Sequence, residues 1–168
     1  AVLFSGTVQD NIFFGQSEAV DTDETLQQAL HLSQAAEFVD RYPEKAAHPI
    51  AQLGRNVSGG QKQRLSIARA LARKPEILIF DDSFSALDYK TDATLREGLA
   101  KQLPGTTKII VAQRISTIRH ADQILVLDRG EIAGLGTHDA LMASCPVYRE
   151  IAMSQLSEEE LKKGGASK

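Results

Sequence analysis

The sequence predicts an α/β fold with a helical region inserted ahead of the strands, and three observations predict it. Apolar residues recur at helical spacing through residues 23–39 and again through residues 59–73, a pattern typical of amphipathic helices. Beyond Pro75, short apolar runs at 77–81 and 108–112 alternate with helical patterns. Helices followed by such an alternation indicate an α/β core with a helical subdomain inserted before it.

The first part of the chain is expected to form short elements separated by turns. In chain order these elements are the end of an apolar strand at 1–4, a short helix at 8–14, a longer helix at 23–39, a turn-rich stretch at 44–57 and a helix at 59–73. Thr7 precedes the first helix and either Thr22 or Asp23 caps the second, because these side chains accept a hydrogen bond from a free amide at a helix start. Pro43 ends the second helix, since proline cannot continue one.

The rest of the chain is expected to alternate strands with helices. The predicted order is strand 77–81, helix 92–103, strand 108–112, short helix 116–120, strand 123–128, strand 131–134, helix 138–142 and helix 147–156. Both 77–81 and 108–112 are apolar throughout most of their length and predict buried strands. Arg129-Gly130 predicts the tight turn of a hairpin, and residues 157–168 form a polar tail.

Composition limits the classes of function. The 168 residues suit one domain or a large piece of one, and their 42% hydrophobic content is ordinary for a globular protein. A net charge of -3, without any basic block, disfavours a broad surface for nucleic acid or anionic lipid. The single cysteine, Cys145, cannot form an internal disulfide, so a reducing compartment is expected. Cys145 itself is expected to be a packing residue.

The strongest chemical signal is the glycine-rich segment 57–64, Val-Ser-Gly-Gly-Gln-Lys-Gln-Arg, at the start of a predicted helix. Ser58 suits the N-cap, and Gly59 and Gly60 allow a ligand to approach the backbone. The free amides and the helix dipole there favour an anion such as phosphate. The alternative is an ordinary capped helix with a flexible start.

Two consecutive carboxylates, Asp81 and Asp82, follow the apolar run 77–80. The carboxyl end of a strand is where ligands bind in α/β sheets. One carboxylate there can hold magnesium through water while its neighbour polarises an attacking water. Asp88 comes shortly afterwards, and its alternative role is to cap the helix that follows.

Together these segments resemble the nucleotide-binding domain of ATP-binding cassette (ABC) proteins, from Leu3 to about Leu156. The implied fold is a partial P-loop NTPase core of the ABC type with its inserted α-helical subdomain. Residues 4–12 and 122–127 further resemble exporter-type members. The residues that the resemblance places at the nucleotide are Ser58, Gly59, Gly60 and Gln61 of the signature motif, Ser85, Ala86, Leu87 and Asp88 of the D-loop, Asp81 of the Walker B strand as magnesium ligand, and Asp82 and Gln113 as catalytic residues.

The resemblance also implies ligands, partners and a division of the chain. ATP and Mg²⁺ are the expected ligands. A second nucleotide-binding domain and the transmembrane domain of the same full-length chain are the expected partners, at the cytoplasmic side of the cell membrane, and no nucleic acid is expected. Residues 1–75 would form the segment after the Q-loop and the helical signature subdomain, 76–156 the C-terminal part of the ATPase core, and 157–168 the tail.

Several positions depart from the family's pattern. No Gly-x-x-x-x-Gly-Lys-Ser/Thr phosphate loop occurs in the sequence, which also begins without methionine, so a fragment that binds ATP poorly by itself is expected. Asp82 replaces the catalytic glutamate with a side chain one methylene shorter, and a misplacement of about 1 Å can cost roughly a hundredfold in rate. Gln113 replaces the switch histidine and cannot carry a proton. Gln52 and its neighbours lack the charges that many exporters have before the signature.

These departures suggest the weak-site subunit of a heterodimeric multidrug exporter. In that arrangement Asp82 and Gln113 belong to a degenerate site, while the intact Ser58–Gln61 completes the competent site of the partner. A slower homodimer is the alternative. Two other classes stay open: a soluble ABC-type ATPase acting on nucleic acid or the ribosome, which the exporter-like segment 4–12 disfavours, and a regulatory module that binds nucleotide without hydrolysis.

Overall fold

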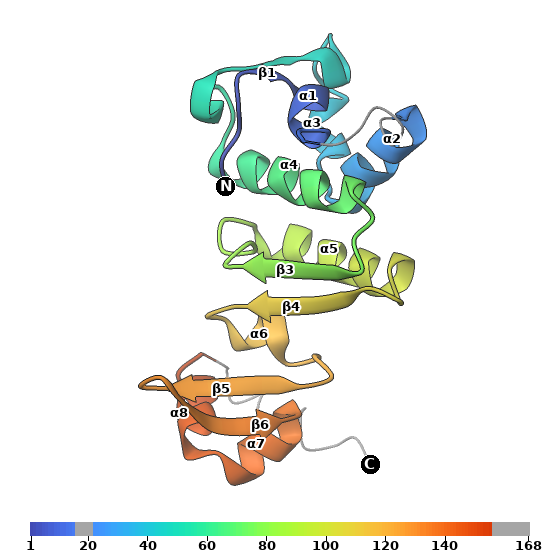
Figure 1. The fold of residues 1–168 in the computed structure, drawn as a ribbon. Helices are drawn as coiled ribbons and strands as arrows, with labels where there is room; N and C mark the ends of the chain where they lie inside the picture. Colours follow the sequence, from blue (N-terminus) through green and yellow to red (C-terminus); the bar gives the residue numbers. More distant parts are fainter. Residues whose placement is uncertain (16–21, 156–168) are drawn as a thin grey trace. The chain divides into compact units, whose positions relative to one another are not determined.

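The computed structural model describes residues 1–15 and 22–155, which form two compact units, Ala1–Val111 and a second from Ala112 onward (Figure 1). The elements of the first unit are β1 (Gly6–Thr7), α1 (Val8–Ile12), α2 (Asp23–Leu32), α3 (Ala36–Val39), η2 (Lys45–Ala47), β2 (Pro49–Ile50), η3 (Gln52–Gly54), α4 (Gly59–Ala72), β3 (Ile77–Asp81), α5 (Tyr89–Gln102) and β4 (Thr107–Val111). Those of the second are α6 (Ile115–Ile118), β5 (Ile124–Asp128), β6 (Glu131–Gly136), α7 (His138–Ser144) and α8 (Pro146–Gln155).

Helix α4 organises the helical part of the first unit, where α1 and α2 both pack against it (Figure 1). Leu65 and Ala68 on α4 are completely buried, as are Val8 and Ile12 of α1. Burial of this kind is the main source of stability in helices this short, because isolated helices of such length are marginal in water. Packing of the buried face of α4 against α1 and α2 therefore fixes where the amino-terminal end of α4 lies within the first unit.

The predicted helix 23–39 is wrong as one element, because the chain breaks it into α2 and α3. Thr22 caps α2 by accepting a hydrogen bond from the Thr25 amide. Gln34 then adopts φ +60°, which no helix tolerates, and the buried Ser33 hydroxyl bonds the Leu30 carbonyl instead of facing water. A short polar side chain thus offers the backbone local hydrogen bonds that compete with the helix.

Strands β3 and β4 pair in parallel, with Ile77 opposite Thr107 and Asp81 opposite Val111. Helix α5 lies along one face of this pair (Figure 1), and its Leu95 joins the same buried core as Phe80 of β3. The prediction of fully buried strands is corrected here: Ile79 on the other face is 67% exposed. One helical layer covers one face only, so residues of β3 alternate between buried and exposed.

The second unit contains the β5–β6 hairpin with three helices. Arg129 and Gly130 both have positive φ, at +49° and +85°, as a type I′ hairpin turn requires, and the predicted turn is confirmed. The hydrophobic core of the second unit includes Ile124, Leu141 and Tyr148. The short helix, both strands and the last two helices agree with prediction to within two residues at every end the structure describes.

Other sequence-based expectations fare unevenly. Helix α1 is confirmed, with Thr7 and Asp10 forming a reciprocal capping box. Residues 1–4 are not a strand in the structure, although Leu3 is buried. The predicted division after residue 75 was based on the roles of the motifs. The two compact units are instead defined by packing and divide the chain between residues 111 and 112. The functional division after residue 75 stays a prediction. The tail 157–168 lies outside the described residues.

Candidate nucleotide site

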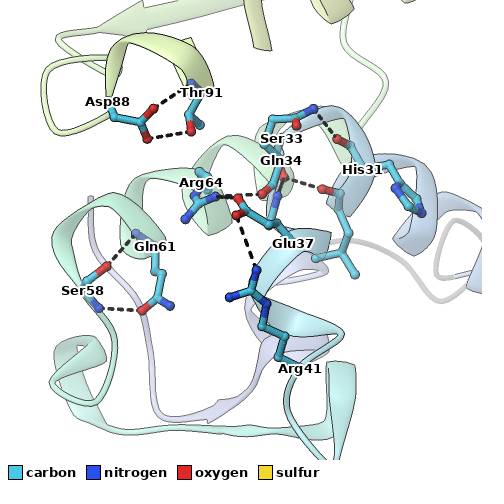
Figure 2. Close-up of polar contacts among 12 residues, drawn as sticks. His31, Ser33, Gln34, Glu37, Arg41, Ser58, Gln61, Arg64, Asp88 and Thr91 are labelled. Atoms are coloured by element: carbon cyan, nitrogen blue, oxygen red, sulfur yellow. Dashed lines mark hydrogen bonds and ion pairs between the residues drawn. The ribbon is translucent and has the colours of Figure 1, made fainter. Parts of the chain in front are cut away.

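The start of α4 is built by a reciprocal capping box between Ser58 and Gln61 (Figure 2). The Ser58 hydroxyl accepts a hydrogen bond from the Gln61 amide at 3.3 Å, and the Gln61 side-chain oxygen accepts one from the Ser58 amide at 2.8 Å. Ser58 is extended, with φ −70° and ψ 163°, as an N-cap must be. The predicted cap is therefore confirmed, and it fixes the direction in which the helix begins.

Between these two capped residues lie Gly59 and Gly60. Neither amide makes a hydrogen bond to any residue that the structure describes, as expected for the first turn of a helix. A Cβ at Gly59 would meet nothing within 4 Å, whereas one at Gly60 would lie 3.1 Å from the Ala86 carbonyl oxygen. Gly59 thus leaves open space for a ligand, and Gly60 allows α4 to approach the loop after β3.

The open amides fit a phosphate group. Each amide is a donor without a partner in the part of the chain that the structure describes, and the fourteen-residue helix behind them adds a partial positive charge of about half a unit at this end. The sequence supplies no competing carboxylate in the first turn of α4. An anion here would satisfy donors that the fold leaves open.

The two carboxylates at the carboxyl end of β3 differ in backbone conformation. Asp81 is the last residue of the strand, whereas Asp82 has φ +49°, in the left-handed region that non-glycine residues rarely adopt. The Asp82 amide donates to the Val111 carbonyl at 3.1 Å, and the Asp82 carbonyl accepts from the Ser85 hydroxyl at 3.0 Å. Both aspartates are exposed. The turn therefore presents two neighbouring carboxylates to solvent.

A magnesium ion at these carboxylates would depend on further ligands. Within the part of the chain that the structure describes, no group of three or more His, Cys, Asp or Glu side chains could hold a metal. Mg²⁺ in phosphate chemistry characteristically uses one or two carboxylates together with waters and phosphate oxygens. Asp81, the predicted ligand, fits that limited share of the coordination.

Asp88 caps α5 with its carboxylate (Figure 2). The side chain accepts hydrogen bonds from the Thr91 amide at 3.0 Å and the Thr91 hydroxyl at 2.7 Å. The backbone bond from Thr91, followed by the hydroxyl bond, lowers the pKa of Asp88 below its ordinary value. Leu87 before it is buried, so the predicted D-loop is held at one end by a cap and an apolar anchor.

Gln113 lies at the start of the second unit and is exposed. Its carbonyl accepts a hydrogen bond from the Gln155 side-chain nitrogen at 2.7 Å, and the Gln155 oxygen accepts one from the Ile115 amide at 2.9 Å. Gln155 on α8 therefore makes hydrogen bonds to the backbone on both sides of Arg114, where α6 begins. Asp81, Asp82, Ser85–Asp88 and Ser58–Gln61 all belong to the first unit.

Sequence reasoning missed two residues of α4 that connect these parts. The Gln63 side chain donates to the Asp82 carbonyl at 3.1 Å and accepts from the Ala86 amide at 3.0 Å. The sequence could have indicated this role, because Gln63 lies four residues after Gly59 and residues i and i+4 lie on the same face of a helix.

Arg64 joins α4 to the break between α2 and α3 (Figure 2). One guanidinium nitrogen lies 3.0 Å from both the Gln34 carbonyl oxygen and a Glu37 carboxylate oxygen. The guanidinium carbon lies 4.9 Å from the centre of the Phe38 ring. With only 15% of its side chain exposed, Arg64 is placed to fix the orientation of α4 relative to these helices.

A family model for the ABC transporter matches residues 2–85, half of the chain. The chain belongs to the ABC transporter family. The matched residues contain the capped helix start, both carboxylates and Ser85, whereas Ala86–Asp88 and Gln113 lie beyond them.

Relatives within the family extend over nearly the whole chain. An uncharacterized ABC transporter ATP-binding protein of Mycobacterium bovis is 47% identical over 154 residues, covering 91% of this chain and 26% of the relative. An ATP-dependent lipid A-core flippase of Xanthomonas oryzae pv. oryzae is 38% identical over 159 residues, covering 95% and 27%. A solved bacterial Atm1-family ABC exporter with ATP bound matches with a TM-score of 0.88 and 35% identity, covering 94% of this chain and 28% of that one.

These matches confirm the predicted ABC fold and its exporter-type relationship. The chain spans only about a quarter of the length of these relatives. Across residues 1–15 and 22–155, no helix of this ABC transporter chain combines the length and apolar character needed to cross a bilayer.

Proposed function

We propose that this chain is part of the ATP-hydrolysing domain of an ABC exporter and that its α4 start completes a nucleotide site on a second ATP-binding domain. The observation that carries this proposal is the pair of open amides at Gly59 and Gly60, framed by the capping box of Ser58 and Gln61. These amides would donate to a terminal phosphate held by the partner. Hydrolysis of ATP supplies the free energy that separates the two domains.

The second part of the proposal is that Asp82 and Gln113 equip a weaker site. Asp82 would orient water as a general base, but its carboxylate is one methylene shorter than the glutamate of the family's pattern. Gln113 would donate a hydrogen bond to phosphate without carrying charge. Because the hydrolytic side is altered while Ser58–Gln61 is intact, a heterodimer with one competent and one degenerate site accounts for both features.

Asp81 would hold Mg²⁺ with water and phosphate oxygens, and Ser85–Asp88 would lie along the boundary between the two domains. The helical region from about Thr7 to Arg73 would meet the transmembrane domain of the full-length protein at the cytoplasmic side of the membrane. The exposed apolar face of β3 and β4, which includes Ile79 and Ile109, would pack against the remainder of the ATP-binding domain. Burial of such a face is favourable in proportion to its apolar area.

The carrying observation is tested with Gly59→Asp in the full-length protein. The new side chain enters open space, so folding should be unaffected, while its negative charge opposes a phosphate at the helix start. ATP-dependent association with the second ATP-binding domain should be lost, measured by crosslinking or light scattering. Gly105→Asp is the matched control, because a Cβ there also meets nothing within 4 Å. Association that survives Gly59→Asp would overturn the proposal.

The weak-site assignment is tested separately by single-turnover ATP hydrolysis. Asp82→Glu and Gln113→His should each raise the rate at the site that this chain equips, and the double variant should raise it further. A rise on the order of 10²-fold for the restored carboxylate is the scale expected for correcting a misplacement of about 1 Å. Unchanged rates in all three variants would instead support a module that binds nucleotide without hydrolysing it.

A further inference from the structure

Two parts of the proposed function meet within the first unit. The start of α4 would serve a nucleotide on the partner, whereas Asp82 would serve the nucleotide of its own domain. The loop 82–86 lies against the first two turns of α4, since a Cβ on Gly60 would come within 3.1 Å of the Ala86 carbonyl oxygen. A movement of either part is therefore felt by the other across a close backbone contact.

Gln63 makes this contact specific. Its side-chain nitrogen donates to the Asp82 carbonyl at 3.1 Å, and its side-chain oxygen accepts from the Ala86 amide at 3.0 Å. A primary amide is suited to this role because it offers a donor and an acceptor in one rigid plane. Both ends of the loop are thereby tied to a single residue of α4.

The loop is sensitive to such a tie because Asp82 is held in an unfavourable conformation. At φ +49°, an aspartate persists only where its surroundings hold it. Its backbone makes hydrogen bonds to Val111 of β4, to Ser85 within the loop and to Gln63. Among these, Gln63 alone comes from the helix whose start would receive the partner's phosphate.

We infer that Gln63 is a positioning residue that couples occupancy of the α4 start to the placement of the Asp82 carboxylate. The inference rests on the proposed function. A phosphate held by Gly59 and Gly60 fixes the first turn of α4, and Gln63 transmits that position to the Asp82 backbone. The nucleotide held by the partner would thereby influence hydrolysis at the site that this chain equips.

A purely structural role for Gln63 is disfavoured by exposure. Both of its hydrogen bonds to the loop are exposed to solvent, so water replaces them readily when they are lost and they add little to folding stability. The amide geometry is nevertheless fixed at both ends. Its effect should therefore appear in the reaction and not in unfolding.

The test compares Gln63→Met and Gln63→Glu in the full-length protein carrying Asp82→Glu, where hydrolysis is easiest to measure. Gln63→Met should lower kcat on the order of 10–100-fold, the range produced by a misplacement of about 1 Å or less, with little change in KM. Thermal unfolding should stay unchanged. Gln102→Met is the matched control, because this exposed glutamine at the end of α5 lies outside the proposed machinery and should leave kcat unaltered.

The pH profile separates positioning from packing. A glutamate at position 63 can still accept from the Ala86 amide but donates to the Asp82 carbonyl only when protonated. Its kcat relative to that of Gln63→Met should therefore rise as pH falls toward the glutamate pKa of about 4.3. A packing role predicts a constant ratio, and a constant ratio would overturn the inference.

Failure of the inference can be told apart from failure of the proposed function. If Gly59→Asp abolishes ATP-dependent association and Asp82→Glu raises the rate, the proposed function stands. Equal kcat for Gln63→Met and the Gln102→Met control in that setting would then refute the coupling alone. If Gly59→Asp has no effect on association, the proposed function itself fails.

Discussion

Replacing Arg69 by methionine should destabilise the protein more than the same change at Arg73, although both arginines lie near the end of α4. The Arg69 guanidinium donates to the Asn11 carbonyl at 2.7 Å, to the Asn11 side-chain oxygen at 2.9 Å and to the Val2 carbonyl at 3.0 Å. Arg73 donates one exposed hydrogen bond, to the Phe14 carbonyl at 2.7 Å. Arg69 therefore holds the N-terminal segment against α4 at several points.

The expected loss follows from these contacts. The two bonds to Asn11 are partly buried and contribute roughly 1–2 kcal/mol each, because hydrogen bonds from charged donors exceed neutral ones. The exposed bond to Val2 and the contact with the Phe4 ring, whose centre lies 5.2 Å from the guanidinium, add about 0.5 kcal/mol each. Methionine keeps much of the packing of the aliphatic stem, so the lost bonds and ring contact account for the cost of Arg69→Met, about 3–5 kcal/mol.

Urea unfolding of the complete ATP-binding domain measures this difference. Arg73→Met, which removes one exposed bond, should lower the free energy of unfolding by no more than about 1 kcal/mol. Asn11 is buried and also makes hydrogen bonds to the Phe4 backbone. The N-terminal segment is therefore still held when Arg69 is changed, and the variant should fold. A difference between the two arginine variants below about 0.5 kcal/mol would refute the reasoning.

Three further predictions concern packing and protonation. Leu95→Ala in α5, at a site with 0% exposure, should lower the free energy of unfolding by about 2–5 kcal/mol in urea melts, because it leaves a cavity. Gly98→Ala places a Cβ 2.9 Å from the end of Leu32, so crowding should offset the gain of about 1 kcal/mol in helix propensity, and Leu32→Ala should restore that gain in a double-mutant cycle. Burial, with a smaller effect of the nearby Arg119, lowers the pKa of His138 below 6.5. The unfolded chain therefore binds more protons than the folded chain, and the free energy of unfolding should fall as pH decreases from about 6.5 through the lowered pKa. Urea melts of His138→Gln should lack this dependence on pH.

The segments predicted from local pattern are largely those that the structure contains. The capped start of α4 at Ser58 depends on a hydroxyl and an amide three residues apart, and both lie within one turn. The Arg129-Gly130 turn likewise depends on two adjacent residues. Short-range hydrogen bonds of this kind involve no distant partner, which is why the sequence was sufficient to predict them.

One prediction failed where the apolar periodicity of a helix was opposed by a local polar contact and by a distant partner. The helix expected over 23–39 ends early because the Ser33 hydroxyl bonds the Leu30 carbonyl and Gln34 turns left-handed. The carbonyl of Gln34 then accepts from Arg64, thirty residues away. Propensity alone cannot anticipate a donor that only packing brings to that carbonyl.

The sequence by itself determined the family to which the chain belongs and the order of most of its helices and strands, and it predicted a phosphate site at the α4 start. These follow from residue spacing, caps and charges that act within a few residues. Only the tertiary structure decided which glycine faces open space and which faces the Ala86 carbonyl, and that Gln63 bonds both ends of the loop after β3. The physical reason is that these contacts join segments about twenty residues apart, whose approach is set by burial of α4 and β3 in one core and leaves no periodic trace in the sequence.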